Sequence, residues 1–175
     1  IPSNVTNIES GAFRKATNLT DINIPEGVTN IGSNAFSTAT SLTSINIPLG
    51  VTSIGTSTFL GATSLTSITF EPNSQLTNIR DNMFYEATSL TSITIPSGVT
   101  TIEYNAFSRS GLTSITIPSG VTSIGNNAFF LTNLTSVTIP SNVTSIGSNG
   151  FGSCSNLTSV TFEDISNSQL TSIGG

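Results

Sequence analysis

The sequence predicts a β-rich repeat solenoid of about seven to eight stacked coils, each of about 23 residues. Three observations lead to this prediction. A phrase close to L-T-S-I-T-I-P-S-G-V-T-S-I-G-x-N-A-F recurs along the chain, its apolar residues keep fixed positions in every copy, and one copy is too short to bury them alone. We expect a single domain over residues 1–175, a fragment of a longer array, with partial coils at both ends. The copies begin at Leu19, Leu42, Leu65, Leu90, Leu112, Leu134 and Leu157.

The first element of each copy is a short strand, because apolar and polar residues alternate in it. In the second copy Ile45 and Ile47 are expected to point inward, while Ser44 and Asn46 point outward. A proline ends the strand in most copies, and glycine or asparagine follows two residues later. Because these two residue types tolerate left-handed backbone, we expect a tight left-handed corner there. The corner residues are Asn4, Gly27, Gly50, Gly98, Gly120 and Asn142.

The second and third elements are an extended V-T-S-I run and an A-F-x-x-x segment, which is too short for more than a turn or two of helix. The inward set of the second copy is Leu42, Ile45, Ile47, Val51, Ile54, Phe59 and Ala62. The position three residues after the phenylalanine is small in every copy, so Cys154 is predicted to be a small core residue rather than a nucleophile.

Two copies depart from the pattern at the same corner. Residues 70–79 read F-E-P-N-S-Q-L-T-N-I, and residues 162–173 read F-E-D-I-S-N-S-Q-L-T-S-I. Insertions in solenoids become loops on one face, which is often a binding face. A bulge without function is the alternative, because extra loop length costs little.

Composition excludes several functions. The net charge is -5 and the cations are only Arg14, Lys15, Arg80 and Arg109, so nucleic acid and anionic membrane surfaces are poor partners. No apolar run is long enough to span a membrane. The chain has no histidine, which excludes Ser-His and Cys-His nucleophile pairs.

The nine acidic residues give no catalytic pair, because they fall at different positions of different copies. Glu163 and Asp164 are adjacent, but they are expected to be solvated on an irregular loop, with a weak calcium site as the alternative. We therefore predict a protein that is not an enzyme and has no catalytic residue, cofactor or metal site.

The outward strand positions form the candidate binding face, which is rich in hydroxyl groups and nearly uncharged. The alternative is that β-branched threonine simply suits strands and keeps them soluble. The candidate residues are Asp21, Asn23, Ser44, Asn46, Ser67, Thr69, Ser92, Thr94, Ser114, Thr116, Ser136, Thr138, Ser159 and Thr161.

Five N-x-S/T triplets could carry N-linked glycans if the source is eukaryotic. Repeated L-T and V-T pairs also create such triplets wherever asparagine precedes them. The acceptors would be Asn4, Asn18, Asn133, Asn142 and Asn156.

The pattern I-P-x-x-V-T-x-I-G-x-x-A-F-x-x-x-x-x-L resembles the BspA-like leucine-rich repeats over essentially the whole chain. It is seen in residues 24–42, 117–134 and 139–157. The family often has cysteine at the small position, where only Cys154 is found here, and glycine replaces the asparagine ladder of ordinary leucine-rich repeats. The resemblance implies a parallel sheet along one face, an extracellular or cell-surface location, and adhesion to host or matrix proteins.

We therefore expect an adhesion module for a protein or glycoprotein ligand. One alternative is a structural repeat that self-associates head to tail, because both chain ends lie inside a repeat and would expose apolar coil edges. Another is an ice-binding array of Thr and Ser. Asp21, Asn23 and Asn46 interrupt the threonine ranks that ice recognition would favour.

Overall fold

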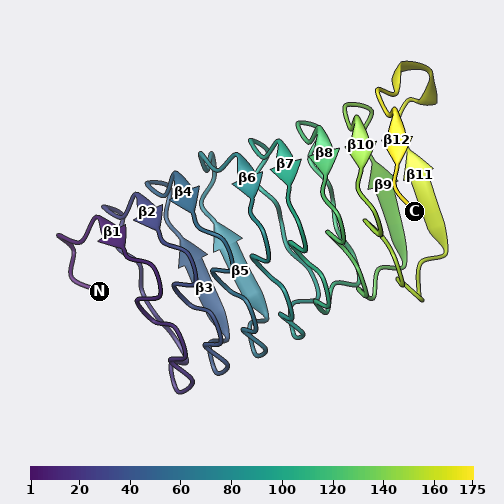
Figure 1. Ribbon diagram of the computed structural model, residues 1–175. Coiled ribbons are helices and arrows are strands. Elements are labelled where there is room, and N and C mark those ends of the chain that lie inside the picture. The colour runs from purple at the N-terminus through teal and green to yellow at the C-terminus, as the bar shows by residue number, and fades with distance from the viewer.

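The computed structural model describes all 175 residues and shows one row of stacked coils, with the N-terminus at one end and the C-terminus at the other (Figure 1). Twelve short strands and one 3₁₀ turn are the only regular elements. Every strand pairing is parallel. The predicted solenoid is confirmed, and the A-F-x-x-x segments are successive turns rather than helix.

The first set of strands comes from the V-T-x-I runs and from the L-T-x-I runs that replace them in the third and last coils, and each strand has two residues. Like residues pair in register, as Ile8 does with Ile31. Two sheets result, of order β1-β2-β4 and β6-β7-β8-β10-β12. The strands are β1 (Asn7–Ile8), β2 (Asn30–Ile31), β4 (Ser53–Ile54), β6 (Asn78–Ile79), β7 (Thr101–Ile102), β8 (Ser123–Ile124), β10 (Ser145–Ile146) and β12 (Ser172–Ile173).

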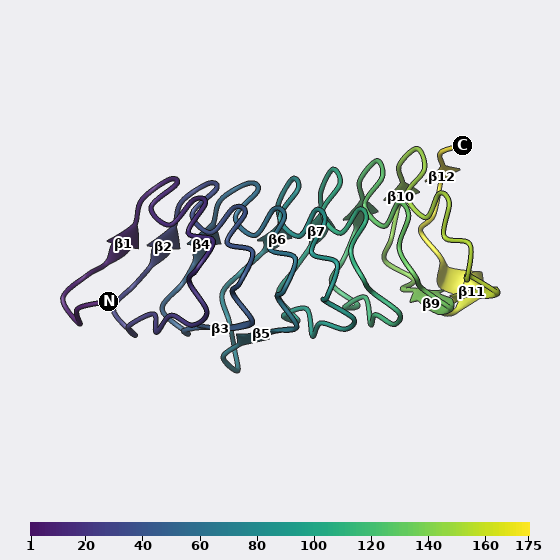
Figure 2. The same ribbon diagram turned by 90° about the horizontal axis from the view of Figure 1, so that it is seen from below.

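The second set of strands comes from the S-I-T-I runs and lies on another side of the coils (Figure 2). It forms two separate pairs, β3 with β5 and β9 with β11. The predicted alternation is confirmed, because Ser44 and Asn46 are exposed while Ile45 and Ile47 are buried. The strands are β3 (Ser44–Ile47), β5 (Ser67–Phe70), β9 (Ser136–Ile139) and β11 (Ser159–Phe162).

Proline explains why the second set forms only two pairs. Coils three and seven have Glu71 and Glu163 where most other coils have proline, and these residues donate their backbone N–H to Ile47 O and Ile139 O of the preceding coil. Proline has no N–H and cannot make this bond. Only the two coils with glutamate therefore extend a four-residue ladder onto the coil before them.

The first set of strands is interrupted between β4 and β6, where Arg80 replaces the glycine of most other coils and the coil carries the insertion at residues 70–79. Neither feature suffices alone. The last coil has the longer insertion but keeps Gly174, and its N–H bonds to the preceding coil. The fourth coil has Glu103 at this position without an insertion, and it also bonds to the preceding coil. Only the third coil combines a residue larger than glycine at this position with an insertion.

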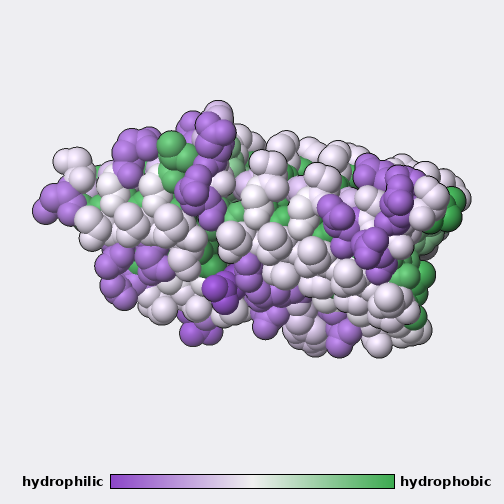
Figure 3. Space-filling view, turned by 90° about the horizontal axis from the view of Figure 1, so that it is seen from above, coloured by the Kyte–Doolittle hydropathy of each residue, from purple (hydrophilic) through white to green (hydrophobic).

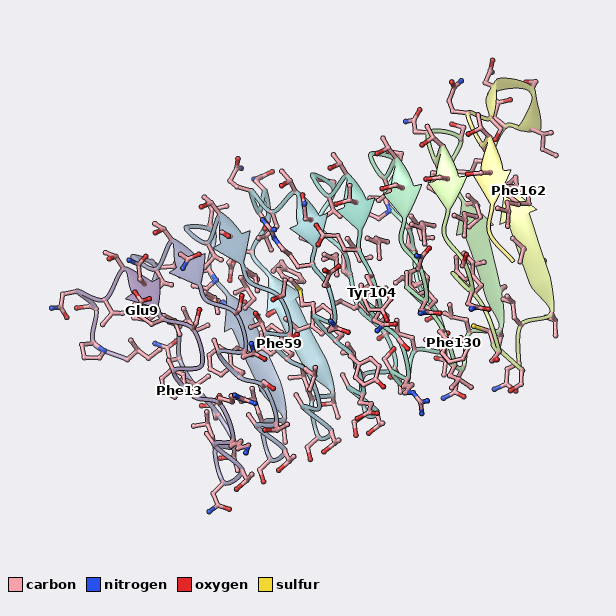
Figure 4. The ribbon with its side chains drawn as sticks, in the orientation of Figure 1. Glu9, Phe13, Phe59, Tyr104, Phe130 and Phe162 are labelled. Carbon is pink, nitrogen blue, oxygen red and sulfur yellow. The ribbon has the colours of Figure 1, made fainter.

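A continuous apolar core runs through both interruptions. It contains 39 buried residues, among them the whole inward set predicted from the second coil. Seven phenylalanine rings stack along it with centroids 5.0–5.6 Å apart and planes within 9° of parallel. The rings belong to Phe13, Phe36, Phe59, Phe84, Phe107, Phe129 and Phe151, of which Phe13 and Phe59 are labelled in Figure 4.

The prediction of left-handed corners after the prolines is wrong. None of the six predicted corner residues has a positive φ. A Cβ at Gly50 would lie 2.5 Å from Glu26 O and 3.1 Å from Val28 O, so close approach of the preceding coil favours glycine there. Left-handed backbone instead occurs two residues before and two residues after each stacked phenylalanine, as at Asn105 (φ 54°) and Arg109 (φ 59°).

Candidate binding face

All fourteen residues predicted to form the binding face are exposed. They lie on the side of the solenoid that carries β3, β5, β9 and β11, at the outward positions of successive coils. The strands along this face are not evenly paired, because four-residue ladders join only two pairs of coils. An unbroken flat rank of hydroxyl groups, as ice recognition would favour, is therefore absent.

A hydrogen-bonded polar group lies where β3 and β5 pair. Asn46 Nδ2 donates to Glu71 Oε1 at 2.9 Å, and Thr69 Oγ1 donates to Asn46 Oδ1 at 2.7 Å. These bonds fix the side chains of neighbouring coils relative to each other. The face thus carries an ordered carboxylate at one edge, although its central positions are uncharged.

The face is hollowed beside this polar group. A groove of about 430 Å³ is lined by residues 66–69 of the third coil, 92–94 of the fourth and 114–116 of the fifth. Its floor contains Ile68 and Ile93, which are buried, and Ile115, which is only partly buried. The lining side chains are otherwise serine and threonine, so the groove combines an apolar floor with hydroxyl-bearing walls.

A second, smaller hollow lies on the other strand set, where β4 and β6 fail to pair. It measures about 320 Å³ and is lined by Arg80, by Ser53, Gly55 and Thr56 of the second coil, by residues 30–33 of the first coil, and by Ser10 before it. Figure 3 views the molecule from this side, and residues of near-neutral hydropathy cover most of the surface.

The acidic residues do not gather into a metal-binding cluster. No group of three or more Asp, Glu, Cys or His side chains is placed to hold a metal ion. Asp164 precedes the 3₁₀ turn η1 (Ile165–Asn167) and is exposed, as is Glu163. Hydrogen bonds from Ser166 Oγ and Asn167 Nδ2 hold the pKa of the Asp164 carboxyl below its ordinary value.

Cys154 lies at the small position, partly buried in the turn after the last stacked phenylalanine. Its Sγ donates to Phe129 O at 3.1 Å and lies 3.2 Å from Thr132 Oγ1. The thiol therefore packs against the preceding coil, as predicted for a small structural residue.

The asparagines of all five N-x-S/T triplets are exposed, and the residue after each is part of the inward set. Asn142 Nδ2 donates to Ser119 O at 2.8 Å, so one acceptor amide is engaged in a contact between coils. Glycosylation stays a prediction for a eukaryotic source.

Sequence reasoning found the exposed columns but missed the groove. The signal was present: Glu71 and Pro96 occupy equivalent positions in successive coils, and only the first has an N–H. The difference indicates unpaired strand edges only when it is known which coils pair.

The repeat pattern matches the model of the BspA type leucine rich repeat region in six copies, over residues 1–112 and 77–175. The chain belongs to this family. A comparison with curated proteins finds no match. The resemblance inferred from the repeat residues is thus confirmed at the level of the family.

Solved structures of bacterial leucine-rich repeat proteins show the same fold. The leucine-rich repeat protein of T. pallidum is 29% identical, with a TM-score of 0.74 over 89% of this chain and 71% of its own. A leucine-rich cell surface protein of Faecalibacterium prausnitzii is 28% identical, with a TM-score of 0.59 over 93% of this chain and 49% of its own.

A leucine-rich repeat protein from Bacteroides ovatus is similar in fold, with a TM-score of 0.67 and 24% identity. The match covers 99% of this chain and 55% of that protein, so this chain spans about half its length. Within the chain itself, no helix has the length and apolar character needed to cross a membrane.

Proposed function

We propose that this chain is a non-enzymatic interaction module of a secreted or cell-surface protein, and that its Ser- and Thr-rich face binds a protein or glycoprotein. One observation carries the proposal: fourteen outward positions of successive coils are all exposed on one face, above a rigid core. Such a surface can contact an extended area of a partner, as solenoid proteins do. The likeness to a leucine-rich cell surface protein supports the location.

Catalysis is not part of the proposal. The chain has no histidine, and its carboxylates do not gather in groups of three or more that could hold a metal. The Asp164 carboxyl, whose pKa is lowered by hydrogen bonds from Ser166 and Asn167, is exposed and engaged with its own loop. These features support a non-enzymatic role, because a nucleophile or general base needs a neighbouring group that activates it.

We predict that Thr138→Arg lowers binding to a protein ligand by at least about tenfold, because a large charged side chain would stand in the middle of an uncharged contact. Binding of the labelled chain to immobilised matrix proteins and glycoproteins would be measured by biolayer interferometry. Ser153→Arg in the same coil is the matched control. It is exposed in the turn after Phe151, at a position that already accepts Arg109 and Lys15 in other coils. Equal loss of binding in the two variants would contradict the assignment of the face.

Binding to this face should also depend weakly on salt. Its central positions carry no charge, so few ion pairs can form with a partner, and screening has little to weaken. Affinity measured between about 50 and 300 mM salt should change by less than about threefold. A steep fall in affinity over this range would point to Arg80 or the acidic residues as the binding groups.

A further inference from the structure

We propose that the groove between β5 and residues 92–95 binds an extended polypeptide segment, which joins the interrupted strand stack as an added strand. This inference rests on the interaction role proposed above and names the site and the kind of partner. The partner is a segment in strand conformation, recognised mainly through its backbone.

Two of the three coils that line the groove, the third and the fourth, carry strand edges that do not pair with each other. At other coil junctions Thr66 N–H donates to Thr43 O at 2.9 Å, and Thr113 N–H donates to Thr91 O at 3.0 Å. No backbone hydrogen bond joins residues 66–70 to residues 91–96. The carbonyls of residues 66–70 and the N–H groups of residues 91–95 therefore make no backbone hydrogen bond to each other. Such edges are templates for another strand.

Side-chain ladders stop at the same place. Thr43 and Thr66 each donate Oγ1 to the equivalent threonine carbonyl of the preceding coil, at 3.3 and 3.0 Å, and Thr113 does so to Thr91 at 3.3 Å. No such bond links Thr91 to Thr66. Meanwhile the stacked rings of Phe84 and Phe107, which belong to the same two coils, remain 5.2 Å apart in the core. The two coils are thus packed together in the core but not hydrogen-bonded at the face, and the opening between residues 66–70 and 91–96 is called the slot below.

The lining of the slot indicates which segment it suits. Ile68 is 6% and Ile93 8% exposed, against 3% for Ile45 in a closed junction, so the floor offers a small apolar surface. The other lining residues are serine and threonine, and none is charged. Because side chains alternate along a strand, a segment that alternates β-branched and small polar residues can place one set on this floor. Main-chain bonds then supply affinity and the floor supplies selectivity.

The slot is open because of Pro96. Glu71, its equivalent in the preceding coil, donates its N–H to Ile47 O at 3.1 Å and draws β5 onto β3. Pro96 cannot donate to Phe70 O, so the fourth coil is not drawn onto β5. Pro96→Glu should restore the donor, close the slot and remove the binding site.

The probe for a direct test is a labelled peptide with the sequence of residues 65–71, L-T-S-I-T-F-E, because this segment fills the equivalent place beside β3. Fluorescence anisotropy should show saturable binding to the wild-type chain. The matched control peptide has the same sequence with N-methyl groups at alternate residues. It should bind at least about tenfold more weakly, because backbone donors are lost while the side chains stay. Equal binding of both peptides would overturn the added-strand geometry.

The variant arm compares Pro96→Glu with Pro25→Glu, the same change in the first coil and away from the slot. Pro96→Glu should weaken peptide binding by at least about tenfold, and Pro25→Glu should leave it unchanged, with circular dichroism confirming that both variants fold. Undiminished binding by a folded Pro96→Glu chain would overturn the proposal. Dimers seen by sedimentation and abolished by Pro96→Glu would assign the slot to a second copy of the chain instead.

The two proposals can fail separately. If the peptide does not bind while a protein ligand still binds in a Thr138-sensitive manner, the slot proposal falls and the interaction role stands. If the peptide binds in the expected way but no protein ligand is found for the face, the slot stands and the wider role falls.

Discussion

Phe107→Ala should lower the free energy of unfolding by about 3–5 kcal/mol, the cost usually found when a buried aromatic ring is removed. The Phe107 side chain has no exposed surface. Its ring lies 5.2 Å from that of Phe84 and 5.4 Å from that of Phe129, measured between centroids. Because each ring packs between those of the neighbouring coils, its removal leaves a cavity that also breaks the contact across the coil junction.

Two controls accompany this variant in a urea titration followed by circular dichroism and by intrinsic fluorescence. Phe130→Ala removes the same ring from a partly buried position outside the stack, and it should cost clearly less. Thr94→Ala changes an exposed residue and should cost well under about 1 kcal/mol. Because repeat arrays can lose cooperativity, the two probes must agree before free energies are compared. Equal costs for Phe107 and Thr94 would contradict the assignment of inward and outward faces.

The columns of the solenoid could be predicted from the sequence because each is a repeated choice between apolar and polar residues. Ile45 and Ile47 alternate with Ser44 and Asn46, and burial follows this alternation. Stacking in register also follows, since identical coils pair best when like residues meet, as Ile8 and Ile31 do. The repeat period and the alternation of apolar and polar residues were together enough to predict the core and the exposed face.

The interruptions of the stack could not be predicted in the same way, because they depend on pairs of coils rather than on one coil. In the sequence Pro96 indicates only the end of a strand. Its effect on pairing follows from the structure, where the equivalent residue Glu71 bonds to the coil before it. Likewise, Arg80 and the insertion beside it open the first set of strands only in combination. The left-handed positions were missed for another reason: asparagine and glycine suggested them at the corners, while residues such as Lys15 and Leu131, which seldom adopt this conformation, hold it in the turns.

Gly55→Ala should destabilise the chain by about 1–3 kcal/mol, although alanine at a compatible site usually stabilises a protein. A Cβ at Gly55 would meet the backbone nitrogen of Ser33 and lie 2.6 Å from its Cα. Gly55 N–H also donates to Ile31 O at 2.8 Å, and the pairing of β2 with β4 holds the two coils at this distance. The coils must therefore move apart or lose that bond, because the atoms in the way are backbone and cannot rotate aside.

Gly27→Ala is the matched control, since it adds the same methyl group at another glycine near a coil junction. There the added Cβ would lie 3.6 Å from Ser3 O and from Val5 O, an ordinary contact, and Gly27 does not have a positive φ. The change should be neutral or stabilising by up to about 1 kcal/mol, because it mainly restricts the unfolded chain. The two variants should thus shift the urea midpoint in opposite directions or by clearly different amounts. If Gly55→Ala proved as harmless as Gly27→Ala, the coils could not be in such close contact at Ser33, and glycine at this position would reflect repetition of the sequence rather than a requirement of the stack.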